Sequence, residues 1–312
     1  MSHFKILVIG DNVEEQLAPY DENLTIEPQV DADWDYLSNL KTARSFYAEH
    51  PEHLPKKPNG DTHTLFTIND LDLLRDYNEG DDIREENGKY VRYTTYNPKS
   101  KWDYYVIGGR YNAWFKIKPG ANPEDYHPSE PHWSENFGNA SNHANASNHA
   151  NASDQAMKRA IDFPAMVAAR RAAAEAEWAK LTEATKGIVP PTFGWAECLD
   201  KHGQENIDAA RTEWNTHPWN MAARKAGFWD AYEDFHMRAA NPRAAYISAQ
   251  EDFATTGFYG VVKDGVWCAR GDMGWFGISN DKVSDAEWRA QVRELIEGLP
   301  DDTWLANVDC HI

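Results

Sequence analysis

The N-terminal run from Phe4 to Ile9 constrains the fold more than any other part of this sequence. It is apolar on both faces of the strand that it predicts, apart from Lys5. Such a strand lies inside a sheet that is covered on both sides, and Gly10-Asp11 ends it. The C-terminal stretch 303–312 predicts another strand, with hairpins and a helix between the two ends. We therefore predict an α+β fold: a mainly antiparallel, ferredoxin-like sheet with its first and last strands paired, plus a helical insertion.

Composition divides the chain into four segments. Residues 1–120 form the N-terminal half of the α+β core, with an acidic insertion near 20–90, and residues 241–312 form its C-terminal half. Residues 157–240 are predicted to be a helical insertion. Residues 121–156 are a loop followed by three related copies of a six-residue unit, Asn139–Ala144, Asn145–Ala150 and Asn151–Ala156. We interpret this repeat as a solvated linker, and we do not assign a metal site to His143 and His149.

Several local elements are specific enough to test. Ser284 and Glu287 form a capping-box pattern that opens a helix. Lys263-Asp264-Gly265 is a hairpin turn between two strands. Further helices are expected over Asp33–Glu49, Asp70–Tyr77 and Met166–Ala184, and further strands over Tyr90–Thr95, Trp102–Gly109, Ala113–Ile117, Ala244–Ala249 and Phe258–Val262.

Charge is distributed unevenly along the chain. The whole chain has 31 Lys and Arg against 50 Asp and Glu, a net charge of −19, whereas residues 91–120 hold six basic residues and one acidic residue. The same stretch is rich in aromatic residues and contains Gly108-Gly109-Arg110. Aromatic surfaces, a close backbone approach and a guanidinium group suit a planar anionic ligand such as a nucleotide. The alternative is that these aromatics are ordinary sheet residues and that Lys116 and Lys118 are edge-strand charges.

A second glycine-rich aromatic loop, Arg270–Gly277, is the natural partner of this segment. It matches neither the phosphate-binding loop nor the dinucleotide fingerprint, and it could equally be a tight turn with a core tryptophan. We predict a pocket that binds a small anionic nucleotide-like ligand without catalysis and without a cofactor. Its predicted residues are Trp102, Tyr104, Gly108, Gly109, Arg110, Trp114, Lys116, Arg270 and Trp275.

The weak candidates for chemistry are His3, Asp309 and His311, with Cys310 between the last two. If the terminal strands pair, the two histidines lie close together, and with the carboxylate they could bind a metal or transfer protons. No HExxH or nucleophile elbow supports them, and polar residues at a sheet edge are the ordinary explanation. We predict no metal site and do not favour an enzyme.

Composition also indicates the compartment and excludes some partners. Three scattered cysteines and the absence of a signal-peptide pattern or a long apolar run predict a cytoplasmic protein that does not bind membranes. The acidic balance argues against general nucleic-acid binding. A homo-oligomer would be compatible with a binding pocket, because symmetric dimers are common.

Several strings resemble a family of hypothetical accessory proteins of tailed phages and some bacteria. They are MSHFKILVIGDNVEEQLAPYDE at 1–22, Lys101–Arg110, His202–Arg211, Met273–Gly277, Leu299–Asp302 and Val308–Ile312. The repeat and much of 20–90 lie outside the resemblance. It implies an accessory protein that works in the cytoplasm of the infected cell, and no activity is transferred with it.

Three hypotheses of function follow. The first is an anti-defence protein that sequesters a nucleotide-derived signalling molecule of the host. The alternative is an acidic protein–protein inhibitor of a host defence enzyme, or a DNA mimic, since the segments on either side of 91–120 are strongly acidic. The third is a hydrolase that acts on nucleotides through His3 and His311.

Overall fold

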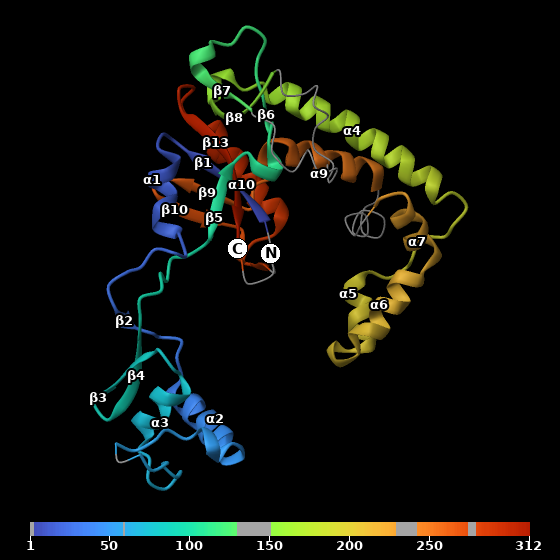
Figure 1. The fold of residues 1–312 in the computed structure, drawn as a ribbon. Coiled ribbons are helices and arrows are strands. Elements are labelled where there is room, and N and C mark those ends of the chain that lie inside the picture. Colours follow the sequence, from blue (N-terminus) through green and yellow to red (C-terminus); the bar gives the residue numbers. More distant parts are fainter. Residues whose placement is uncertain (1–2, 59, 130–150, 229–241, 274–278) are drawn as a thin grey trace. The chain divides into compact units, whose positions relative to one another are not determined.

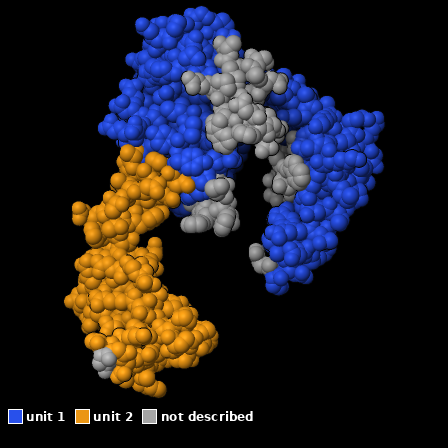
Figure 2. All heavy atoms as spheres, viewed as in Figure 1, with its two compact units in different colours: residues 1–17, 104–312 blue, residues 18–103 orange. Residues whose placement is uncertain are grey.

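The computed structural model describes residues 3–58, 60–129, 151–228, 242–273 and 279–312. The chain divides into two compact units (Figures 1 and 2). Unit 1 consists of residues 1–17 and 104–312, and unit 2 consists of residues 18–103. The acidic part of the sequence around residues 20–90 thus falls within unit 2.

An eight-stranded sheet forms the centre of unit 1. Its order is β10-β9-β1-β13-β8-β6, with β5 also paired to β13 and β7 to β8. The strands are β1 (His3–Ile9), β5 (Tyr104–Ile107), β6 (Phe115–Lys116), β7 (Tyr126–Pro128), β8 (Ala152–Met157), β9 (Gly260–Lys263), β10 (Val266–Ala269) and β13 (Trp304–His311). The first and last strands pair antiparallel with His3 opposite His311, which confirms the α+β prediction. The sheet is nevertheless mixed, because β1 and β9 are parallel, and it is larger than a ferredoxin-like sheet.

Helices cover one face of this sheet. The main core joins Leu7 and Ile9 of β1 to Trp288, Val292 and Ile296 of one helix. The helices of unit 1 are α1 (Val13–Leu17), α4 (Phe163–Ala184), α5 (Trp195–His202), α6 (Ile207–Thr216), α7 (Pro218–Lys225), α9 (Pro242–Thr256) and α10 (Asp285–Glu297). Among these, α4 and α9 run side by side (Figure 1).

Two satellite cores lie among the remaining helices of unit 1. One joins α4, α7 and α9 and includes Leu181, Trp219 and Tyr246. The other is small: its buried members are Cys198 of α5 and Ala210 and Trp214 of α6. Unit 1 also contains a two-stranded sheet of β11 (Gly271–Met273) and β12 (Ser279–Asp281).

Unit 2 has its own sheet and core. The sheet has the order β2-β4-β3, formed by β2 (Gln29–Val30), β3 (Asp82–Glu86) and β4 (Lys89–Thr94). The helices α2 (Tyr36–Glu49) and α3 (Asp70–Tyr77) pack together around Ala43, Tyr47 and Leu73. Unit 2 therefore has what a folding unit needs, a closed apolar core and paired strands.

Two expectations about local structure are wrong. The third repeat copy, Asn151–Ala156, is not linker, because β8 occupies Ala152–Met157 and Ala152, Ser153 and Ala156 are buried in the sheet. Ala244–Ala249 is not a strand but lies within α9, where Tyr246 and Ile247 are buried in the core that includes Leu181 of α4. The first two repeat copies lie outside the described residues.

Two other local predictions are confirmed. β9 and β10 form the hairpin, with Asp264 and Gly265 in the left-handed region at φ of 53° and 71°. Ser284 and Glu287 cap α10 reciprocally. Among the described residues, no helix combines the length and the apolar character that a bilayer span requires.

Candidate ligand-binding site

The face of the central sheet that carries Leu7 and Ile9 of the main core also carries buried polar residues toward the other end of β1. Alternate residues of a strand share a face, so His3 and Lys5 of β1 lie beside their register partners His311 and Asp309 of β13. Asn307, two residues before Asp309, lies on the same face and is fully buried. Charged side chains are seldom buried without partners, so each of these groups needs an identified partner.

The carboxylate of Asp154 on β8 holds the chain that follows β5. It accepts hydrogen bonds from the backbone N–H groups of Ala113 (2.9 Å) and Trp114 (3.2 Å). It also accepts from Oγ of Ser129 at 2.6 Å and from Nδ2 of Asn307 at 2.8 Å. Four protein donors thus replace the water that this buried carboxylate would otherwise bind. The two backbone hydrogen bonds fix the position of residues 113 and 114.

The backbone at Gly108 and Gly109 lies directly against the side chains of Asp154 and Asp309. Both have positive φ, 75° and 52°. A Cβ on Gly108 would lie 2.6 Å from Oδ2 of Asp154, and one on Gly109 would lie 2.6 Å from Cβ of Asp309. The close backbone approach inferred from the glycines is therefore to the protein's own carboxylates. The backbone N–H of Arg110 then donates to Oδ2 of Asp309 at 2.9 Å.

Lys5 lies beneath the same segment in an aromatic enclosure. Its Nζ is 2.6 Å from the centroid of the Trp114 ring and 5.0 Å from those of Phe253 and Phe258. Nζ has no hydrogen-bond partner among the described residues. Burial disfavours the ammonium form and holds the pKa of Lys5 well below its usual value, although the charge of Asp154 opposes this shift.

A histidine–carboxylate pair lies at the end of β13. Nδ1 of His3 donates to Oδ1 of Asp309 at 2.9 Å, and Nε2 of His3 is 3.5 Å from the Tyr104 hydroxyl. The ring of Tyr104 stacks on that of His311 with centroids 4.5 Å apart. Burial lowers the pKa of His3 and outweighs the opposing effect of Asp309. We call His3, Tyr104, Asp309 and His311 the strand-end cluster.

A cavity of about 500 Å³ opens beside the 111–117 segment. Its wall combines the aromatic rings of Tyr111, Trp114 and Phe253 with the cations Lys116 and Arg170. Asp162, the N-cap of α4, is the one acidic residue of its lining. Burial raises the pKa of Tyr111 to about 12, so this phenol stays neutral. We call this space the aromatic cavity.

The cations of the aromatic cavity differ in their partners. The guanidinium of Arg170 donates to Glu177 at 2.9 Å and also bonds Gln250. Lys116 is exposed, and its ammonium group forms no ion pair within the part of the chain that the structure describes. Of the two cations in the described lining of this cavity, Arg170 is paired with a carboxylate and Lys116 is not.

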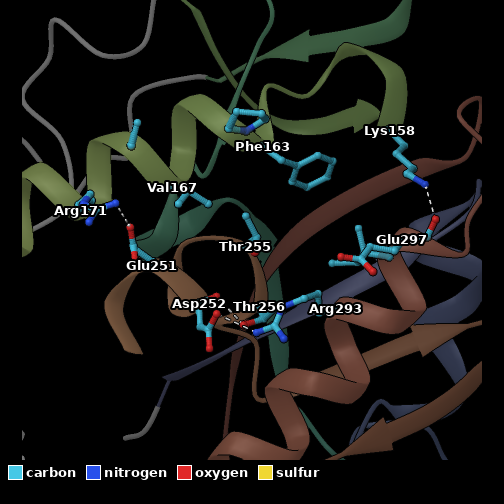
Figure 3. A pocket seen from close by; sticks show the side chains of 13 residues that line it. Lys158, Phe163, Val167, Arg171, Glu251, Asp252, Thr255, Thr256, Arg293 and Glu297 are labelled. Carbon is cyan, nitrogen blue, oxygen red and sulfur yellow. Dashed lines mark hydrogen bonds and ion pairs between the residues drawn. The ribbon is translucent and has the colours of Figure 1, made fainter. Parts of the chain in front are cut away.

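A larger cavity, of about 720 Å³, lies between α4, α9 and α10, and its charges are compensated (Figure 3). Arg171 pairs with Glu251 at 3.1 Å, and Arg293 pairs with Asp252 at 2.8 Å. Lys158 donates to the backbone carbonyl of Glu297 at 2.9 Å. Paired charges make this cavity a poorer site for an anion than the aromatic cavity, despite its greater volume.

The structure separates the nine predicted pocket residues. Trp114 and Lys116 line the aromatic cavity, whereas Tyr104 belongs to the strand-end cluster. Arg110 is exposed on the turn after Gly109. Three members fall elsewhere: Trp102 is a buried residue of unit 2, Arg270 is paired with Asp281 and Asp285, and Trp275 lies outside the described residues.

Sequence reasoning missed most of the cavity wall. Arg170 and Phe253 come from α4 and α9, far along the chain, and only the fold brings them to Trp114. Lys5 carries a local signal, since it is a charged residue in an otherwise apolar strand. Asp154 carries none, because its repeat copy has no strand periodicity.

Comparison of the chain with known proteins identifies no relative. No protein-family model, no curated protein and no solved structure matches the chain. The geometry of the site is therefore what indicates the function.

Proposed function

We propose that this chain binds a planar anionic ligand of the nucleotide class in the aromatic cavity without transforming it. The observation that carries the proposal is the pairing of aromatic walls with the uncompensated ammonium of Lys116 in a cavity of about 500 Å³. Cavities of roughly 300–1,000 Å³ accommodate small ligands. Stacking on aromatic rings contributes about 1–3 kcal/mol per base, and a hydrogen bond to a charged group about 1.5–3 kcal/mol.

The phage-family resemblance extends this proposal to a biological role. An accessory phage protein with such a cavity would sequester a nucleotide-derived signal of the host defence in the host cytoplasm. Sequestration needs affinity and a slow release but no reacting group, which agrees with the lining of the aromatic cavity. Its polar side chains are suited to fixing orientation and charge.

Calorimetric titration with mononucleotides and cyclic dinucleotides tests the proposal. Lys116→Ala should weaken binding about tenfold or more, because it removes a charge-assisted contact. Lys118→Ala is the matched control, since Lys118 lies two residues away, bonds the backbone carbonyl of Arg159 and does not line the cavity. Equal affinities of Lys116→Ala and the wild type for every bound nucleotide would refute the proposal.

The strand-end cluster supports a second candidate function, acid–base hydrolysis of a nucleotide. The specific observation is the bond from His3 Nδ1 to Asp309, which fixes the ring and directs Nε2 toward Tyr104. Carboxylates orient general-base histidines in this way. Incubation with the same nucleotides distinguishes the two functions: hydrolysis by the wild type that His3→Gln abolishes establishes the enzyme, and intact nucleotide supports simple binding.

A further inference from the structure

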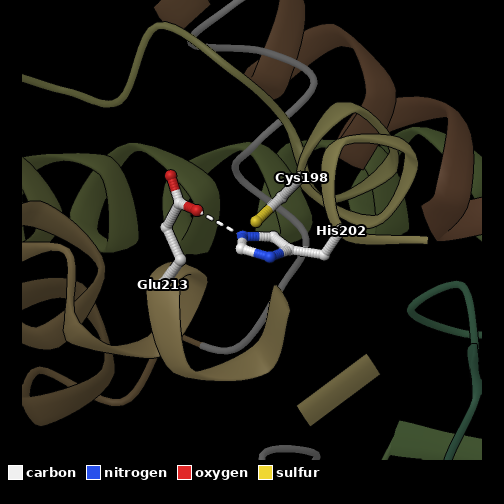
Figure 4. Close-up of side chains that lie close together, drawn as sticks. All are labelled: Cys198, His202 and Glu213. Carbon is white, nitrogen blue, oxygen red and sulfur yellow. Dashed lines mark hydrogen bonds and ion pairs between the residues drawn. The ribbon is translucent and has the colours of Figure 1, made fainter. Parts of the chain in front are cut away.

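A cluster of metal-ligating side chains lies away from both sites described above. Cys198 and His202 are four residues apart on α5, so they share one face of the helix. Glu213 comes from α6, and one ligand atom from each of the three residues lies within 4.8 Å of the other two. Figure 4 shows the Cys198 thiol beside the His202 ring, near the nitrogen that bonds the Glu213 carboxylate.

Local backbone features explain why these helices bring the three residues together. Gly203 ends α5 with φ of 80°, and a short turn leads into α6 at Ile207. The thiol of Cys198 is buried and donates to the carbonyl of Ala210 at 3.4 Å, which fixes α6 beside α5. Nε2 of His202 already bonds Oε2 of Glu213 at 2.5 Å.

We propose that Cys198, His202 and Glu213 bind one divalent transition-metal ion of the zinc class. Sulfur, imidazole nitrogen and carboxylate oxygen are the three donor types of protein zinc sites, and three protein ligands leave a fourth position for water. The thiol releases its proton to solvent on binding, so thiolate and carboxylate together balance the charge of a divalent cation. The His202–Glu213 hydrogen bond is replaced by two bonds to the metal.

A bound metal would also strengthen the packing of this helix pair. Among the described residues, the α5–α6 core has Cys198, Ala210 and Trp214 as buried members, with Phe193, Trp195 and Leu199 partly buried against them. A core of this size contributes little stability, and small elements are commonly held by a metal or a disulfide. The ion would join the C-terminal half of α5 to α6, next to that core.

Lys201 is the competing partner in this cluster. Its Nζ lies 2.7 Å from Oε1 and 2.8 Å from Oε2 of Glu213. It is 62% exposed, compared with 22% for His202 and 30% for Glu213, and so it can turn into solvent when the metal binds. Removal of this lysine should therefore preserve or strengthen metal binding.

Titration of the reduced, chelator-treated full chain with Co²⁺ tests the proposal. We expect one ion per chain and a near-ultraviolet thiolate-to-cobalt absorption band, which Zn²⁺ displaces. Cys198→Ser should abolish the band, and Glu213→Gln, which removes a charged ligand with little change in side-chain size, should weaken binding about tenfold or more. Cys268→Ser, at an exposed cysteine elsewhere, and Lys201→Met should retain it.

Each of three results would overturn the assignment. The first is the absence of a thiolate band in the wild type. The second is a band that persists in Cys198→Ser, and the third is an affinity that Glu213→Gln leaves unchanged. Far-ultraviolet circular dichroism of each variant identifies any loss of signal that comes from unfolding, and Glu213→Gln keeps the test decisive if Cys198→Ser does not fold.

Discussion

At the scale of single residues, the central sheet keeps a lysine where an apolar residue would pack. Lys5 is 5% exposed, and aromatic rings surround its ammonium group. Aromatic faces attract a cation, but they replace only part of its hydration. Together with Asp154 and Asp309, this lysine therefore helps to fix the 108–114 segment. Its burial lowers the stability of the folded protein.

We expect Lys5→Met to raise the free energy of unfolding by about 1–4 kcal/mol at neutral pH, as replacement of buried charges often does. The pKa of Lys5 in the folded state lies below 10.5, its value in the unfolded chain. Between the two pKa values, the unfolded chain therefore binds more protons than the folded chain. The free energy of unfolding of the wild type therefore rises as pH increases toward 10.5. The difference in stability between Lys5→Met and the wild type becomes smaller over the same range.

Urea denaturation of both proteins at pH of about 7 and about 9.5 measures this difference. A matched Lys118→Met variant, at an exposed position, should show neither the gain nor its pH dependence. A gain from Lys5→Met that stays constant between the two pH values would contradict the argument.

At the scale of elements, the Gly108–Gly109 turn links the sheet to the wall of the aromatic cavity. It brings the chain back over Asp154 and Asp309, so that Tyr111 and Trp114 face the cavity from a fixed backbone. The glycines thus act through the protein's own polar residues. Their effect on a ligand is indirect, through the position of the residues that follow.

Gly109→Ala should destabilise the protein by more than about 1 kcal/mol, because alanine is strained at positive φ and its Cβ would collide with Asp309. Gly120→Ala is the control, since Gly120 has φ of 78° and no atom within 4 Å of an added Cβ. Thermal unfolding measures the loss of stability in each variant. Gly120→Ala reports backbone strain alone, and Gly109→Ala reports strain together with the collision. Equal losses would show that the contact with Asp309 is not tight.

The sequence predicted elements well where the local signal was strong. The pairing of β1 with β13, the β9–β10 hairpin and the α10 capping box each follow from short apolar or turn patterns. β8 was missed because the Asn-Ala-Ser repeat has no strand periodicity, and only partners from β6, β7 and β13 make it a strand. The parallel β1–β9 contact was missed for the same reason, since strands far apart in sequence leave no local signal.

At the scale of the whole molecule, the acidic segment is a folded unit of its own. Residues 18–103 enclose a core of Ala43, Tyr47, Leu54, Ile68 and Leu73. The chain enters and leaves this unit between α1 and β5 of unit 1. Composition predicts an acidic insertion near residues 20–90, whereas a separate core in residues 18–103 is visible only in the tertiary structure.

Residues 18–103, produced alone, should therefore unfold cooperatively and keep the helical and strand signals of α2, α3 and the β2-β4-β3 sheet. Circular dichroism during thermal unfolding measures this. A chain in which a short glycine-serine linker replaces residues 18–103 should retain nucleotide binding, because every lining residue of the aromatic cavity belongs to unit 1. An unfolded 18–103 fragment would contradict the division into two units.

Native mass spectrometry of the full chain tests whether the aromatic cavity holds a nucleotide. The protein is purified from bacteria with an active nucleotide-signalling defence and compared with a denatured sample and with Lys116→Ala. We expect an intact nucleotide that the wild type retains, that denaturation releases and that Lys116→Ala largely loses. A cleaved nucleotide would favour hydrolysis at the strand-end cluster, and a co-purifying host protein with no small molecule would contradict ligand binding in the aromatic cavity.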